Sequence, residues 1–149
     1  MRAVVQRVRE CSVSVDSEAI SSIRLGLLVY LGVTHNDNEV DAGYIADKVV
    51  NLRVFPDEDG RMNLSAVDLG REIIVVSQFT LYGDVRKGRR PSYDSAARPE
   101  HAQALYNLVL TMISERGLPT CGGKFQAKMD VQYVNEGPIT ILIDSQKQF

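Results

Sequence analysis

The chain is poor in the side chains that most often carry enzyme chemistry. Its 149 residues include no tryptophan, only two histidines and only two cysteines. Cys11 and Cys121 lack the spacing of a metal site, so we expect both to be reduced and to pack as small apolar residues. A metal centre and a disulfide framework are therefore disfavoured.

Long hydrophobic runs are also absent. No apolar stretch approaches the ~20 residues that a membrane-spanning helix needs. Residues 1–8 alternate like a strand and lack the uninterrupted apolar core of a signal peptide. We therefore expect a cytoplasmic protein. The length and the 44% hydrophobic content are typical of one globular domain, which we place at residues 1–149.

The chain has no large excess of either charge, since its formal net charge is −2. This balance does not by itself indicate a nucleic-acid-binding protein. The charges are unevenly placed, however, because Arg86, Lys87, Arg89 and Arg90 lie within residues 86–90. Such a run is often only a solvated loop. Here it closely follows residues 77–81, a candidate catalytic motif that is described below, and this closeness favours contact with phosphate.

The apolar periodicity predicts a mixture of strands and helices. One helix should begin with Asn36 or Asp37 as its N-cap and end before Pro56, and another should have Pro99 in its first turn and end at Gly117. A long loop should occupy residues 82–98. Alternating or continuous apolar runs predict strands over residues 2–8, 11–16, 19–23, 26–33, 72–79, 124–134 and 139–144.

This order of elements is not a regular alternation of strands and helices. It predicts an α/β protein of the α+β type, with a mixed, curled sheet of about six to eight strands and two main helices packed on it.

Two short motifs combine small polar groups with special backbone next to apolar strands. They are Ser77-Gln78-Phe79-Thr80-Leu81, here the Ser-Gln motif, and Asn135-Glu136-Gly137-Pro138-Ile139-Thr140, here the Gly-Pro motif. Backbone N–H groups and a glutamine amide at the end of a strand are the components of an oxyanion hole, although Ser77 and Thr80 can also simply cap a strand and a turn. The second motif is either an ordinary turn or a cis Gly–Pro peptide that orients two carbonyls in parallel.

Other catalytic arrangements have little support. The chain contains neither a G-x-S-x-G elbow nor a Walker-type phosphate loop. A serine triad through Ser77 would need His35 or His101, and we expect both histidines at the surface.

Taken together, the two motifs resemble the signature of the D-aminoacyl-tRNA deacylase (D-tyrosyl-tRNA deacylase) family. Residues 1–8, 62–65 and 86–93 extend the resemblance along the whole chain. The resemblance implies a cytoplasmic homodimer that hydrolyses the ester between a D-amino acid and the 3′ end of tRNA. It also implies hydrolysis of glycine mischarged onto tRNA-Ala, and we expect no metal and no organic cofactor.

The family resemblance also assigns roles to individual residues. It implies an oxyanion hole from the Gln78 side chain and the Phe79 N–H, with Ser77 in the same catalytic motif and Thr80 holding the substrate's amino group. It implies a cis Gly–Pro bond that each subunit inserts into its partner's site to reject L-aminoacyl groups. The residues assigned to this selection and to substrate binding are Gly137, Pro138, Arg7, Asn135 and Met129.

Because no strong side-chain base is visible, we expect the substrate's own 2′-hydroxyl to take part. We expect tRNA phosphates to contact Arg86, Lys87, Arg89 and Arg90, with Lys124 and Lys128 as further candidates.

Three alternative functions remain at this point. The first is a sister family acting on L-alanyl-tRNA, which looks similar but has Pro-Gln where this chain has Ser77-Gln78, and lacks Arg7. The other two are a non-catalytic module that binds an RNA end or a nucleotide, and a small esterase with Ser77 as its nucleophile.

Overall fold

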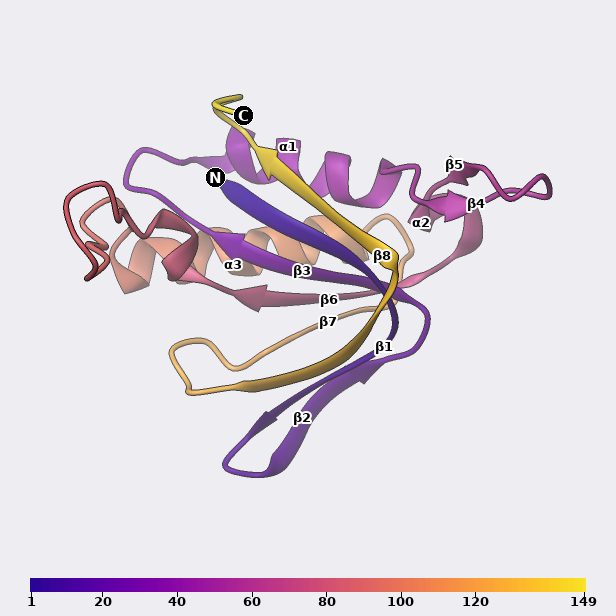
Figure 1. Ribbon diagram of the computed structural model, residues 1–149, viewed down its shortest axis with the longest axis horizontal. Coiled ribbons are helices and arrows are strands. Elements are labelled where there is room, and N and C mark those ends of the chain that lie inside the picture. The colour runs from indigo at the N-terminus through magenta and orange to yellow at the C-terminus, as the bar shows by residue number, and fades with distance from the viewer.

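The computed structural model describes residues 1–149 and contains one mixed sheet with helices packed on one of its faces (Figure 1). The strands of this sheet are β1 (Arg2–Val15), β2 (Glu18–Ile23), β3 (Gly26–Gly32), β6 (Glu72–Ser77), β7 (Thr120–Gly122) and β8 (Asp130–Asp144). The strands β4 (Phe55–Pro56) and β5 (Met62–Leu64) form a separate pair. The helices are α1 (Glu39–Asn51), α2 (Ala66–Leu69), the 3₁₀ helix η1 (Phe79–Tyr82) and α3 (Pro99–Ser114).

The sheet has the strand order β2-β1-β3-β6-β7, and β8 pairs with β1. Strand β1 is antiparallel to β2, β3 and β8, whereas β6 is parallel to both β3 and β7. The long strands curl, so the sheet approaches a closed barrel (Figure 1). The predicted mixed, curled sheet with two main helices is therefore confirmed.

The two central strands are buried on both faces because a different apolar cluster covers each face. Leu27, Val29 and Leu31 of β3 join α1 and α3 in the larger cluster. Leu28 lies in a smaller cluster inside the curled part of the sheet, together with Ile74 of β6. This double burial explains why the sequence of β3 is almost continuously apolar. None of the helices is long and apolar enough to cross a membrane.

The N-cap of helix α1 lies two residues after Asn36, the earlier of the two predicted caps. Asn38 is the N-cap, and its side chain accepts a hydrogen bond from the Val40 N–H at 2.8 Å. Asp37 does not cap the helix because its buried carboxylate pairs with the α-ammonium group of Met1 at 2.6 Å. A cap needs a free side-chain oxygen directed at the first turn, which only Asn38 provides.

Two predicted strand breaks are absent. Residues 2–8 and 11–16 were expected as separate strands, but β1 is continuous because it pairs with β8 along nearly its whole length. Residues 124–134 and 139–144 likewise belong to one strand, β8, which begins only at Asp130 and continues through Pro138. The pairing of β1 with β8 shifts register between Gln6 and Glu10, and these shifts accommodate the Gly-Pro motif.

Candidate active site

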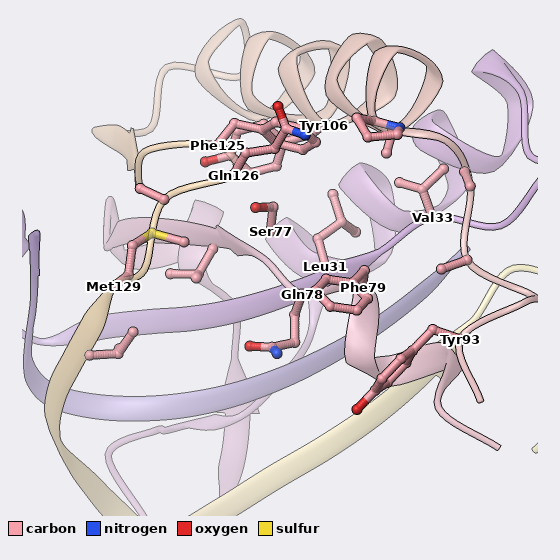
Figure 2. A pocket seen from close by; sticks show the side chains of 17 residues that line it. Leu31, Val33, Ser77, Gln78, Phe79, Tyr93, Tyr106, Phe125, Gln126 and Met129 are labelled. Atoms are coloured by element: carbon pink, nitrogen blue, oxygen red, sulfur yellow. The ribbon is translucent and has the colours of Figure 1, made fainter. Parts of the chain in front are cut away.

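A cavity of about 600 Å³ opens beside the end of β6, between the sheet and the start of α3 (Figure 2). Most of its lining is apolar, since 13 of its 17 lining residues are hydrophobic. The lining residues are Leu31, Val33, Val76, Ser77, Gln78, Phe79, Tyr93, Ala96, Ala97, Pro99, Ala102, Tyr106, Phe125, Gln126, Ala127, Met129 and Val131. A mostly apolar cavity with a few polar groups at one wall is typical of a small-molecule site.

The Ser-Gln motif supplies that polar wall. Ser77 is the last residue of β6, and Phe79 begins η1, so the chain turns between them at Gln78. The first N–H groups of a helix have no partner within the helix, which leaves the Phe79 N–H available to a ligand. Figure 2 shows the Ser77 hydroxyl pointing into the cavity and the Gln78 amide near its mouth. Three predicted catalytic residues therefore lie together, with Met129 on the cavity wall.

Thr80 is the fourth predicted catalytic residue, and it reaches the site through Gln78. The side-chain amide of Gln78 donates a hydrogen bond to the Thr80 hydroxyl oxygen. A carboxamide nitrogen has two N–H groups, so one remains free. Because the Thr80 oxygen accepts this bond, its own O–H is free to donate.

The apolar wall contains residues that the sequence analysis did not assign to a site. Tyr106 of α3 and Phe125 pack with their ring centroids 5.9 Å apart. The Tyr106 hydroxyl donates to the Val75 carbonyl at 2.9 Å, and burial raises the pKa of this phenol to about 12. Tyr106 was recognised only as part of the apolar face of a helix. Such a face does not distinguish a cavity wall from a packed core.

No histidine lines the cavity. The His35 ring contacts the Asp94 carbonyl at 2.7 Å, and the His101 ring contacts the Asp37 carbonyl at 2.9 Å. Both residues are exposed, as the sequence predicted. A Ser77 nucleophile would therefore lack an imidazole partner.

Burial raises the pKa of the Cys11 thiol to about 11, so this thiol stays protonated and neutral at physiological pH.

The Gly-Pro motif lies in β8, and its backbone is held from both sides. The Gly137–Pro138 peptide bond is cis, as the family resemblance implies. The side-chain amide of Asn135 donates to the Arg7 carbonyl at 3.1 Å and to the Ile139 carbonyl at 2.9 Å. Gly137 and Pro138 themselves are exposed.

Arg7 contacts the same segment through its side chain. Its Nε lies 3.2 Å from the Glu136 carboxylate, and its Nη1 donates to the Val54 carbonyl at 2.5 Å. The Arg7 side chain is only 11% exposed. Through these two contacts it ties the Gly-Pro motif to the segment that follows α1. Glu136 is a partner that the sequence analysis did not single out.

Within one chain, the two motifs lie at opposite ends of the sheet. Ser77 pairs with Leu31, whereas Asn135 is in register with Val8 and, through Gly26, with Glu72. The separation from Glu72 to Ser77 is about 17 Å at ~3.3 Å per residue. In Figure 1, β6 ends on the left and β8 bends on the right. Accordingly, Arg7, Asn135, Gly137 and Pro138 do not line the cavity of their own chain.

The predicted tRNA-binding residues lie in an exposed loop, residues 86–90, here the basic loop. Arg86 is already paired, because its guanidinium donates to the Asp84 carboxylate at 2.9 and 2.7 Å. These hydrogen bonds hold the pKa of Asp84 at about 2. Lys87, Arg89 and Arg90 have no ion-pair partner in the chain.

The fold and the cavity together define a site suited to hydrolysis that relies on backbone and amide donors. The sequence profile of the family described as D-Tyr-tRNA(Tyr) deacylase matches residues 4–144. Proteins named D-aminoacyl-tRNA deacylase from Thermoanaerobacter sp. (strain X514) and Clostridioides difficile (strain 630) are 58% and 54% identical over 149 residues, covering 100% of each chain.

Two solved structures share the fold of this chain. A structure described as "c-Myc DNA Unwinding Element Binding Protein" has a TM-score of 0.90 and 40% identity, and the match covers 97% of this chain and 98% of that one. A structure described as a probable eukaryotic D-amino acid tRNA deacylase shares the fold, with a TM-score of 0.82 at 16% identity and coverage of 95% and 97%. The chain belongs to the D-Tyr-tRNA(Tyr) deacylase family and is a hydrolase that acts on D-aminoacyl-tRNA.

Proposed function

We propose that the protein proofreads the chirality of aminoacyl-tRNA, with ester cleavage in the cavity and stereochemical selection by the Gly-Pro motif of a second subunit. The observation that carries the proposal is the position of Ser77, Gln78 and Phe79 at the mouth of an apolar cavity that no histidine lines. An aminoacyl ester is already activated, so positioning water and stabilising the oxyanion are sufficient contributions from the protein.

In the proposed reaction, water attacks the ester carbonyl carbon and the 3′-oxygen of the terminal ribose leaves. The Gln78 amide and the Phe79 N–H stabilise the negative charge on the former carbonyl oxygen. Thr80, whose hydroxyl is fixed by Gln78, holds the amino group of the substrate. The substrate's 2′-hydroxyl assists the proton transfer, which would restrict the enzyme to RNA.

The proposed selection requires a homodimer. Gly137 and Pro138 are exposed and lie far from their own chain's cavity, so they can enter only the cavity of a second copy. There, their carbonyl groups would occupy the space into which an L side chain projects, leaving polar groups unpaired. Glycine has no side chain to exclude, so glycine mischarged onto tRNA-Ala would also be hydrolysed.

Exposed apolar residues support association of two copies. Leu142 is 58% exposed and Val134 is 44% exposed, and both belong to β8, the strand that carries the Gly-Pro motif. Such side chains on the strand that must cross to the partner are suited to a dimer interface.

We further propose that the unpaired cations of the basic loop contact tRNA. We also propose that the protein acts in the cytoplasm, where aminoacyl-tRNA is used.

A hydrolysis assay with three substrates tests this function. Purified protein should hydrolyse D-tyrosyl-tRNA and glycyl-tRNA-Ala while leaving L-tyrosyl-tRNA intact. Equal rates on D- and L-tyrosyl-tRNA would contradict chiral selection, preference for L-alanyl-tRNA would assign the chain to the sister activity, and binding without hydrolysis would indicate an RNA-end-binding module. Ser77→Ala should retain most of the activity, whereas complete loss would favour a serine esterase.

A further inference from the structure

Two aromatic side chains lie exposed at the mouth of the cavity, outside its buried wall. The rings of Phe79 and Tyr93 pack edge to face, with centroids 5.0 Å apart and planes at 72°. Despite this contact, Phe79 is 58% exposed and Tyr93 is 39% exposed. Figure 2 shows the pair at the rim, apart from the rings of Tyr106 and Phe125. An exposed aromatic pair loses little on binding a flat, apolar partner and gains a stacking contact.

The backbone fixes Tyr93 in this position. Asp84 and Ser92 exchange two backbone hydrogen bonds, of 2.8 and 2.9 Å, which close the base of the basic loop. Tyr93 is the next residue, and its ring packs over Gly83, where an added Cβ would lie 3.1 Å from the ring carbon Cε1. The pair is therefore a fixed platform joined directly to the basic loop.

The electrostatics around the pair favour a negatively charged partner. Residues 84–94 contain four cationic side chains and two carboxylates, Asp84 and Asp94. Asp84 is neutralised by Arg86, so Lys87, Arg89 and Arg90 remain without an acidic partner. Aromatic rings beside unpaired cations are the combination that binds single-stranded nucleic acid, because bases stack while cations contact phosphates.

We propose that Phe79 and Tyr93 stack against the unpaired nucleotide that precedes the esterified terminal adenosine of tRNA, while Arg89 and Arg90 contact its phosphates. This inference rests on the proposed function, because the Phe79 N–H must face the ester of the terminal nucleotide. Phe79 thus has two roles: its backbone contacts the reacting ester, and its ring helps position the preceding base. Tyr93 is a positioning residue that does not touch the reacting atoms.

The test compares substrates that differ by one nucleotide. These are D-tyrosyl-adenosine and the dinucleotide D-tyrosyl-CpA, which adds the preceding cytidine. For each protein, the readout is the ratio of kcat/KM for the dinucleotide to kcat/KM for the nucleoside. Tyr93→Ala should lower this ratio about tenfold, mainly through KM for the dinucleotide, as expected for loss of a base–aromatic stack.

Two variants control for indirect effects. Tyr93→Phe retains the ring and should restore the ratio. Met62→Ala removes another exposed apolar side chain, in β5, and should leave the ratio unchanged. An equal loss on both substrates in Tyr93→Ala would show that Tyr93 supports the catalytic motif rather than a base, and no change in the ratio would also overturn the inference.

A change on the RNA side tests the same contact without altering the protein. Fluorescence anisotropy would compare an uncharged oligonucleotide ending in CCA with one that is abasic at the penultimate position. The abasic oligonucleotide should bind about tenfold more weakly, and equal affinity would contradict the inference. The proposed function fails if the wild type does not hydrolyse D-tyrosyl-tRNA. Stacking fails separately, in a protein that hydrolyses this substrate, if either the kinetic ratio or the binding does not respond to the base.

Discussion

The side-chain amide of Gln78 donates a hydrogen bond to the hydroxyl oxygen of Thr80. This contact joins the end of β6 to the first turn of η1 and limits the orientations of the amide. An amide fixed in this way needs little rearrangement to bind a developing oxyanion, which is the condition under which such donors act most strongly. In the proposed mechanism the two residues have different roles, with Gln78 as the electrostatic donor and Thr80 as its support and an amino-group ligand.

This separation predicts unequal effects of the two truncations. Gln78→Ala should lower kcat about 10²–10³-fold, as expected for removal of one oxyanion donor. Thr80→Ala should lower activity by about tenfold without abolishing it, and Thr80→Ser, which keeps the hydroxyl, should restore most of the loss. Single-turnover hydrolysis of D-tyrosyl-tRNA measures both variants. If Thr80→Ala were as damaging as removal of a catalytic nucleophile, a mechanism without a reactive side chain would be untenable.

Arg7→Lys should weaken chiral discrimination more than it lowers turnover of the D substrate. Lysine cannot contact the Val54 carbonyl and the Glu136 carboxylate with the same planar fork, so the Gly-Pro motif would be less firmly held. The measurement is the ratio of hydrolysis rates for D- and L-tyrosyl-tRNA. Arg9→Lys is the matched control, because Arg9 also faces Glu136, at 3.7 Å, but is 70% exposed. Equal losses on both substrates in Arg7→Lys would indicate a purely structural role.

Cations of the basic loop should contribute unequally to tRNA binding. Arg89→Gln should weaken binding and reduce the slope of log K against log salt by about one, because Arg89 has no acidic partner in the chain. Arg86→Gln should reduce the slope less, since the Arg86 guanidinium is engaged by Asp84. Binding titrations at several salt concentrations compare the two. A larger change of slope in Arg86→Gln than in Arg89→Gln would contradict the assignment of a phosphate contact to Arg89.

Stability should decrease at alkaline pH. Burial raises the pKa of Cys11 from 9.0 to about 11, so between these values the folded chain keeps a proton that the unfolded chain has lost. The contribution of Cys11 to the free energy of unfolding is therefore fully present below pH 9 and is lost as the pH rises toward 11. Cys11→Ala should flatten this decline, whereas Val13→Ala, another buried substitution in β1, should lower stability without changing its pH dependence. Urea unfolding at each pH measures this, and a single transition is expected if residues 1–149 form one domain.

The sequence was sufficient for features encoded by local patterns. The buried strands β3 and β6 and the helix α3 follow directly from apolar runs and from the proline in the first turn of α3. Ser77, Gln78 and Phe79 could be placed at one site because they are adjacent at the end of a strand. The exposed positions of His35 and His101 also followed from their polar surroundings.

Features that depend on tertiary pairing could not be predicted in this way. The continuity of β1 and β8 results from their mutual pairing, which no local signal reports. The capping role of Asn38 depends on the use of Asp37 by the Met1 α-ammonium group, a contact across 36 residues. The distance between the Gly-Pro motif and the cavity follows from strand register, so the sequence could suggest a second subunit only through the family resemblance.

The most direct test of the account is a heterodimer in which the two motifs are altered on different chains. One chain carries Gln78→Ala. The other carries Gly137→Ala, which strains a residue at φ +123° and directs a Cβ against Ile139. Two affinity tags isolate the mixed dimer, and the two variant homodimers serve as references. The measured quantity is hydrolysis of D- and L-tyrosyl-tRNA.

If selection acts across the interface, the single active cavity receives the intact Gly-Pro motif of the Gln78→Ala chain. The heterodimer should then hydrolyse D-tyrosyl-tRNA at about half the wild-type rate per dimer and still reject L-tyrosyl-tRNA. Rejection of the L substrate as poor as that of the Gly137→Ala homodimer would show that each chain selects for itself, and would contradict the account.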